Sequence, residues 1–186
     1  MHIQVTGKRV LFEGNYLRLV KKDIDAGELG NWTWETIERV KVYGRGAVVI
    51  AAITRDKELI LERNWRAPLE SYILQFPAGV MDIEGESEED AARRELQEET
   101  GYQAGDMIPI ISVPLTPDFT ATRATHFFAP DVELTGEGFT DVPEVIEVIK
   151  VPLEQLGDYF LNIPADTEID LRVPGLLWIL KQRKLI

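Results

Sequence analysis

The residues best suited to chemistry are three glutamates within five positions, Glu95, Glu98 and Glu99. Their i, i+3, i+4 spacing places all three carboxylates on one face of a helix. Ala91 and Ala92 fall in the same sector of a helical wheel. The ordinary explanation of such a cluster is a solvated acidic face, but that orientation would also expose the alanines. Burying the alanines instead turns the carboxylates toward the protein.

Carboxylates that share a partly dry site repel one another, and their pKa values rise. A bound divalent cation removes that cost. The neighbouring sequence offers no His or Cys, and a ligand set made only of oxygens favours a hard ion such as Mg²⁺ or Mn²⁺. We therefore expect a divalent-metal site on this helix. The small alanines leave room for another backbone segment, for which Pro77-Ala78-Gly79 is the candidate.

The elements that must position this helix follow from local sequence signals. Ser87 and Asp90 have N-cap and N3 spacing, and Gly101 supplies a left-handed stop, so a helix is expected between them. Pro152 is suited to begin a short helix, and a final helix is expected over 166–184 with Pro174 starting its main part or kinking it. Strands are expected at 47–53, 58–63, 71–76, 107–113, 125–129 and 145–151. This order of elements predicts an α/β fold with a mixed sheet and helices on its faces.

The N-terminal region is expected to form a small separate sheet. The segments 16–20 and 32–36 alternate apolar and polar residues, and the second places Trp32 and Trp34 on one face. The segment 44–46, Gly-Arg-Gly, is the best boundary, because a continuously apolar strand follows it. We therefore divide the chain into a β appendage, residues 1–45, and a main domain, residues 46–186.

Composition excludes several classes of protein. The net charge of −12, without a basic stripe, argues against binding to a nucleic-acid backbone. The absence of cysteine excludes disulfides and thiolate metal sites and fits a reducing cytoplasm. The N-terminus has no apolar stretch long enough for a signal peptide, and the longest apolar run, 47–53, is far shorter than a membrane span. We expect a cytoplasmic protein that contacts neither nucleic acid nor membrane.

The segment that contains the glutamates resembles a known motif. Gly79, six residues, Glu86, seven residues and then Arg94-Glu95-Leu96-Gln97-Glu98-Glu99-Thr100-Gly101-Tyr102 is similar to the Nudix box, G-x5-E-x7-R-E-U-x-E-E-x-G-U, where U is a bulky apolar residue. The first gap is one residue longer here, and we expect the loop before the helix to absorb that residue.

Further segments resemble the ADP-ribose pyrophosphatase branch of this family. The segments 64–66 (N-W-R) and 75–79 (Q-F-P-A-G) are similar to its Q-Y-R and E-L-P-A-G, with Gln75 where Glu is usual. The segment 116–120 (T-P-D-F-T) resembles its S-P-G-F-S, and Pro117 follows Gly101 at the spacing associated with that branch, whereas Thr122 stands where relatives often have Glu. The N-terminal strands match a small sheet that relatives exchange with a second subunit.

The resemblance implies roles for the residues of the motif. Glu95 and Glu99 are the expected metal ligands, Glu98 is a ligand or orients the attacking water, and the Ala78 carbonyl is a further ligand. Glu86 and Arg94 are expected to form an internal pair that holds the loop on the helix, with Gly79 and Gly101 as structural members of the motif; the alternative for the pair is an ordinary surface contact.

The general base and the substrate contacts come from other segments. In this branch the base precedes a late strand with the pattern E-x-I-x-V, which makes Glu144 the candidate, in competition with Glu98, Glu137 and Glu147. Further implied substrate contacts are Arg66 to a phosphate and Pro117. Trp32 and Trp34 either stack on the nucleobase or serve as sheet core or dimer contact.

The resemblance implies a Nudix-fold α/β/α sandwich with a mixed sheet and a small N-terminal antiparallel sheet. The expected protein is a homodimer that uses Mg²⁺ or Mn²⁺ to hydrolyse the diphosphate linkage of a small-molecule nucleotide sugar. ADP-ribose is the first choice, and the products are a nucleoside monophosphate and a sugar phosphate. Alternatives are GDP-mannose or a dinucleotide as substrate, or a domain that senses a nucleotide without turnover.

Overall fold

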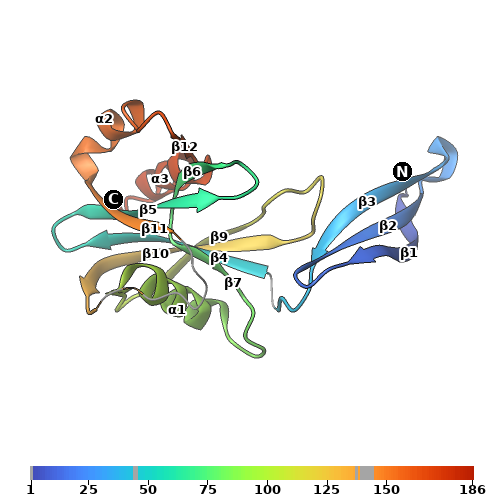
Figure 1. The fold of residues 1–186 in the computed structure, drawn as a ribbon, viewed down its shortest axis with the longest axis horizontal. Coiled ribbons are helices and arrows are strands. Elements are labelled where there is room, and N and C mark those ends of the chain that lie inside the picture. Colours follow the sequence, from blue (N-terminus) through green and yellow to red (C-terminus); the bar gives the residue numbers. More distant parts are fainter. Residues whose placement is uncertain (1, 44–45, 137, 139–144) are drawn as a thin grey trace.

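The computed structural model describes residues 2–43, 46–136, 138 and 145–186. In these residues a three-stranded sheet projects from a larger body built on a nine-stranded sheet (Figure 1). The small sheet consists of β1 (Gln4–Glu13), β2 (Leu17–Asp25) and β3 (Asn31–Arg39), with a short 3₁₀ helix at Gly27–Leu29. The body contains β4 (Gly46–Thr54), β5 (Glu58–Arg66), β6 (Ser71–Gln75), β7 (Ala78–Val80), α1 (Glu88–Thr100), β8 (Tyr102–Gln103), β9 (Ile108–Pro114), β10 (Arg123–Leu134), β11 (Ile146–Pro152), a 3₁₀ turn (Leu153–Gln155), α2 (Leu156–Leu161), β12 (Thr167–Ile169) and α3 (Arg172–Gln182).

The large sheet is mixed, which confirms the predicted α/β class. Its main path runs β12-β6-β5-β4-β10-β8, and β11 pairs with β5, β7 with β4 and β9 with β10. Strand β10 is parallel to β4, and β12 is parallel to β6, whereas the other pairs are antiparallel. Helix α1 covers one face of the sheet, and α2 and α3 lie on the opposite side (Figure 1).

Each face of the large sheet carries its own hydrophobic core. Val49, Ala51 and Ile53 of β4 join the core that includes residues of α3. Val48 and Ile50, which alternate with them, join the core that includes residues of α1. Because successive strand residues point to opposite faces, a strand covered on both sides must be apolar throughout. This explains the uninterrupted apolar run that the sequence shows in β4.

Helix α1 begins and ends where the capping signals predict. The Ser87 hydroxyl accepts a hydrogen bond from the backbone N–H of Asp90 at 3.1 Å. Gly101 has a left-handed backbone conformation with φ of 75°, and a Cβ there would lie 2.3 Å from the carbonyl oxygen of Gly136. Glycine is therefore needed at position 101 for both conformation and space.

The prediction of a final helix over residues 166–184 is wrong at the N-terminal end of that helix. Thr167–Ile169 form β12, which pairs in parallel with Tyr72–Leu74, and α3 begins only at Arg172. Pro174 then lies in the first turn of α3, where its missing N–H costs no hydrogen bond. No helix in the described part of the chain is long and apolar enough to span a membrane.

The appendage contacts the body along its edge strand β3. The N–H of Ile37 donates to the carbonyl of Phe119 at 2.6 Å, and the Trp34 indole N–H donates to the carbonyl of Asp118 at 2.9 Å. Trp32 pairs with Ile24 and Trp34 with Lys22 across β2, which places both indoles on one face of the sheet. The appendage retains many exposed apolar side chains, among them Val5, Val10, Phe12, Tyr16, Trp32 and Trp34.

Candidate active site

The inner face of α1 lies on the sheet. Ala91, Ala92 and Leu96 are completely buried in the core beneath the helix. The Glu95 side chain is only 12% exposed and that of Glu98 is 30% exposed. Burial of the alanines thus brings the carboxylates against the protein, as their shared helical face implies.

Strand β7 meets these carboxylates with its backbone. The N–H of Ala78 donates to Oε2 of Glu99 at 2.8 Å. A Cβ placed on Gly79 would lie 1.8 Å from Cδ of Glu95, so the Glu95 carboxylate occupies the space above this glycine. Only a residue without a side chain allows that approach. The structure therefore brings together the backbone of residues 78–79 and two glutamates of the helix.

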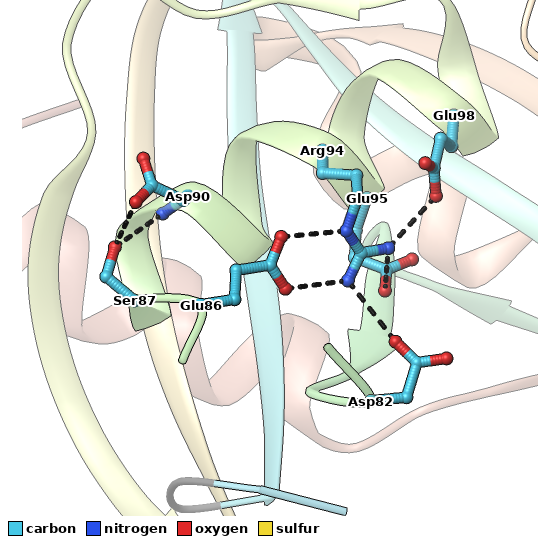
Figure 2. A network of polar contacts seen from close by, with 7 residues as sticks. All are labelled: Asp82, Glu86, Ser87, Asp90, Arg94, Glu95 and Glu98. Atoms are coloured by element: carbon cyan, nitrogen blue, oxygen red, sulfur yellow. Dashed lines mark hydrogen bonds and ion pairs between the residues drawn. The ribbon is translucent and has the colours of Figure 1, made fainter. Parts of the chain in front are cut away.

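Arg94 joins the helix to the loop that precedes it, as Figure 2 shows. Two of its guanidinium nitrogens, Nε and Nη2, donate to the two carboxylate oxygens of Glu86 at 2.9 and 3.0 Å. The third nitrogen, Nη1, donates to Glu95 at 2.9 Å and to Glu98 at 3.0 Å. The hydrogen bonds to Glu86 are the main reason that the pKa of Arg94 lies above its usual value. Arg94 is therefore a permanent positive charge among these carboxylates.

The additional residue of the motif is absorbed before the helix. Residues 83–86 form a turn in which the Glu86 N–H donates to the carbonyl of Ile83 and Gly85 takes a left-handed conformation with φ of 82°. Glu86 still reaches Arg94 with both oxygens, and Gly79 still lies against Glu95. The longer gap thus leaves the relative placement of the motif residues intact.

Burial and crowding raise the pKa values of two of the glutamates. Desolvation raises the pKa of Glu95 to about 7, against the lowering influence of Arg94. Desolvation also raises the pKa of Glu99, and the neighbouring carboxyl of Glu62 adds to this effect. Glu62 lies on β5, is completely buried, and lies against Glu99, a neighbour that the sequence analysis did not anticipate. The spacing within β5 shows only that Glu62 shares a face with Ile60. That this face lies under α1 is visible only in the fold.

This donor set fits a hard divalent cation. Its side-chain ligands are carboxylate oxygens that repel one another in a partly dry site, and a cation would offset that repulsion. Among the described residues, no three acidic or imidazole groups already converge closely enough to hold a metal. The Arg94 guanidinium instead lies between Glu95 and Glu98. Ligation by Ala78, Glu95, Glu98 and Glu99 remains a prediction.

The expected substrate residues fall in two places. Arg66 ends β5 on the face that also carries Glu62, and it donates to the side-chain oxygen of Gln75 at 3.1 Å. Trp34 lies beside the loop that contains Pro117. The appendage with both tryptophans extends away from α1 along the long axis of the molecule (Figure 1). A single chain therefore does not bring Trp32 and Trp34 to the carboxylates.

Of the candidate bases, Glu144 and Glu137 lie outside the described residues. Glu147 is exposed on β11, pairs in register with Arg63, and forms an ion pair with it at 3.3 Å. Arg63 belongs to the face of β5 that also carries Leu61, which packs in the core on the α3 side. Glu147 thus points away from α1, and this geometry disfavours it as the base.

Comparison with known proteins identifies the family. Residues 43–171 match the model of the NUDIX domain. The chain is 34% identical over 148 residues to the ADP-ribose pyrophosphatase of Bacillus subtilis (strain 168), an alignment that covers 79% of this chain and 77% of that protein. It is 33% identical over 144 residues to the methanol dehydrogenase activator of Bacillus methanolicus, with 76% of each chain covered.

A crystal structure of an ADP compounds hydrolase has a similar fold. It superimposes with a TM-score of 0.81 at 24% sequence identity, and the match covers 98% of this chain and 94% of that one. This coverage includes the N-terminal sheet as well as the body. With the matched domain and the two relatives, it follows that this chain belongs to the Nudix hydrolase family.

Proposed function

We propose that this protein hydrolyses the diphosphate linkage of nucleoside diphosphate sugars, with ADP-ribose as the preferred substrate. The products are a nucleoside monophosphate and a sugar phosphate. The observation that carries the proposal is the packing of Glu95 and Glu99 of α1 against the backbone of Ala78 and Gly79. The likeness to a Bacillus subtilis protein named ADP-ribose pyrophosphatase supports this choice of substrate.

The reaction requires a divalent cation, for which Mg²⁺ and Mn²⁺ are the candidates. Glu95, Glu98, Glu99 and the Ala78 carbonyl are the residues that would hold it. A bound cation supplies positive charge that offsets the negative charge developing on the phosphate oxygens. Arg94 and Glu86 hold the loop of residues 82–86 on the helix and so keep the carboxylates in position.

Other residues of the chain orient the substrate and the water. Arg66 holds a phosphate group through its guanidinium fork. Glu98, more exposed than Glu95, orients the water that attacks one phosphorus atom. Glu144 accepts the proton of that water as the new P–O bond forms and the bond to the bridging oxygen breaks. The second phosphate leaves with the bridging oxygen.

The active form is proposed to be a cytoplasmic homodimer that requires neither nucleic acid nor membrane. Three strands with an exposed apolar surface need a covering partner for full stability. Because a single chain keeps Trp32 and Trp34 away from α1, the appendage of a second copy would bring them to the nucleobase. Light scattering at micromolar concentration should give twice the chain mass. A monomer with full activity would contradict this arrangement.

The substrate is tested by measuring kcat/KM for ADP-ribose, GDP-mannose and a dinucleotide with Mg²⁺ and with Mn²⁺. ADP-ribose should give the highest value, and a chelator should abolish every activity. A higher kcat/KM for GDP-mannose or the dinucleotide would change the assigned substrate but not the proposed hydrolysis of a diphosphate linkage. Tight binding of these compounds without any turnover would refute the hydrolase proposal and indicate a nucleotide sensor.

A further inference from the structure

Glu62 is a buried side chain that lies beneath helix α1. Ile60 of the same strand packs in the core with residues of α1, and the side chain two positions further on points to the same face. Glu62 is 0% exposed. Its carboxyl lies against that of Glu99. The strand thus places a fourth acidic side chain next to the glutamates of α1.

Two carboxyls that meet in a buried place repel each other, whereas an aliphatic side chain would fill the same position on β5 without that repulsion. A divalent cation bound between the carboxyls would offset the repulsion. The position of Glu62 against Glu99 is therefore the arrangement expected of two carboxylate ligands of one cation.

Two buried amides beside Glu62 point to a ligand independently. Gln75 pairs with Glu62 across β5 and β6 and is 3% exposed, and Asn64, two positions after Glu62, is 1% exposed. Within the described residues, neither side-chain amide nitrogen has a hydrogen-bond acceptor. Buried N–H donors of this kind are normally satisfied by ordered water. A hydrated cation would bring positive charge to the carboxyls and water oxygens to the amides.

We propose that Glu62 is a further carboxylate ligand of the divalent-cation site, and that Gln75 and Asn64 hold water bound to that cation. This inference rests on the metal site of the proposed function. Gln75 occupies the position at which the branch that this chain resembles usually has Glu. In this chain the acidic member of the cross-strand pair is Glu62 on β5, and its partner on β6 is Gln75.

The test measures Mn²⁺ binding to chelator-treated full-length protein by calorimetry and by electron paramagnetic resonance of free Mn²⁺. Glu62→Gln removes the charge and keeps the shape. Glu58→Gln is the matched control, because Glu58 begins the same strand and pairs with Lys150 at 3.1 Å. Glu62→Gln should weaken Mn²⁺ binding by about 10- to 100-fold, as loss of groups around a metal does. Glu58→Gln should change it less than about twofold, as expected of an exposed ion pair remote from the metal.

Thermal unfolding separates this role from a structural one. In chelator, the melting temperature of Glu62→Gln should equal or exceed that of the wild type, because the substitution removes an unfavourable contact between two buried carboxyls. The increase in melting temperature that Mn²⁺ causes should be smaller in the variant, since ligand binding stabilises the folded state according to affinity. Lower stability in chelator together with unchanged Mn²⁺ affinity would overturn the proposal.

The failure of this inference is distinct from failure of the proposed function. If the wild type binds Mn²⁺ and Glu62→Gln binds it equally well, only the role of Glu62 is refuted. If the wild type binds no Mn²⁺, the metal site itself is refuted. Glu62→Asp keeps the charge, and its Mn²⁺ affinity should lie between those of the wild type and Glu62→Gln. If Glu62→Gln does not fold, Glu62→Asp compared with Glu58→Asp provides the same test.

Discussion

Gly79→Ala should inactivate the enzyme while leaving it folded. The new Cβ would lie 1.8 Å from Cδ of Glu95, whereas ordinary contact begins at 3.4 Å, so the carboxylate must retreat by about 1.6 Å. Gly79 does not have a left-handed conformation, so alanine adds no backbone strain there. The group that must move is the flexible end of a side chain, and the fold can therefore adapt. Displacement of a reacting group by about 1 Å can cost about 100-fold in rate.

The assay compares kcat for ADP-ribose hydrolysis in Gly79→Ala and the wild type, with circular dichroism and thermal unfolding as checks of the fold. We expect kcat to fall by about 100-fold or more and the melting temperature to change little. Gly105→Ala is the control, because a Cβ at position 105 meets no atom within 4 Å. A folded Gly79→Ala protein with near-normal kcat would refute the placement of Glu95 in the metal site.

Three further outcomes are expected. Arg94→Lys keeps the positive charge but loses the guanidinium fork that binds Glu86. Urea unfolding should show that the free energy of unfolding falls by about 1–3 kcal/mol. An unchanged free energy of unfolding would mean that the pair of Arg94 and Glu86 is only a surface contact. Burial lowers the pKa of His126. As the pH falls, the imidazole therefore gains a proton in the unfolded chain before it does so in the folded protein. The stability that the neutral ring provides is thus complete above about pH 6.5 and is lost as the pH falls below it; His126→Gln should flatten this part of the melting-temperature profile, and an unchanged slope would contradict the assignment. Glu144→Gln should lower kcat by about 10²–10⁴ with little effect on KM, whereas Glu147→Gln should not; the reverse order would show that the base is Glu147.

The sequence was sufficient for the helix because its signals are local. Ser87 and Gly101 determine where α1 begins and ends through contacts within a few residues of each terminus. The spacing of Glu95, Glu98 and Glu99 determines which helical face they share, and the buried alanines indicate which face lies on the sheet. The mixed sheet could be predicted because the order of strands and helices along the chain is also visible in the sequence.

The features that were missed depend on contacts between distant segments. Thr167–Ile169 is a strand only because β6, nearly a hundred residues earlier, offers a free parallel edge. The significance of Glu62 depends on α1 packing over β5, which places it beside Glu99. The position of the tryptophans depends on how the loop of residues 116–119 meets β3. Neither propensity nor spacing within one segment contains this information.

The most direct test of the central claim is product analysis for the wild type and Glu99→Gln. Each protein is incubated with ADP-ribose and Mg²⁺, and products are identified by mass spectrometry after its fold has been verified. The wild type should form AMP and ribose 5-phosphate in equal amounts, and no product should form in chelator. Glu99→Gln should lower the rate by more than about 100-fold, because it removes the charge of a metal ligand and preserves its shape. Equal rates in the two folded proteins, or intact ADP-ribose after incubation with the wild type and Mg²⁺, would contradict the account.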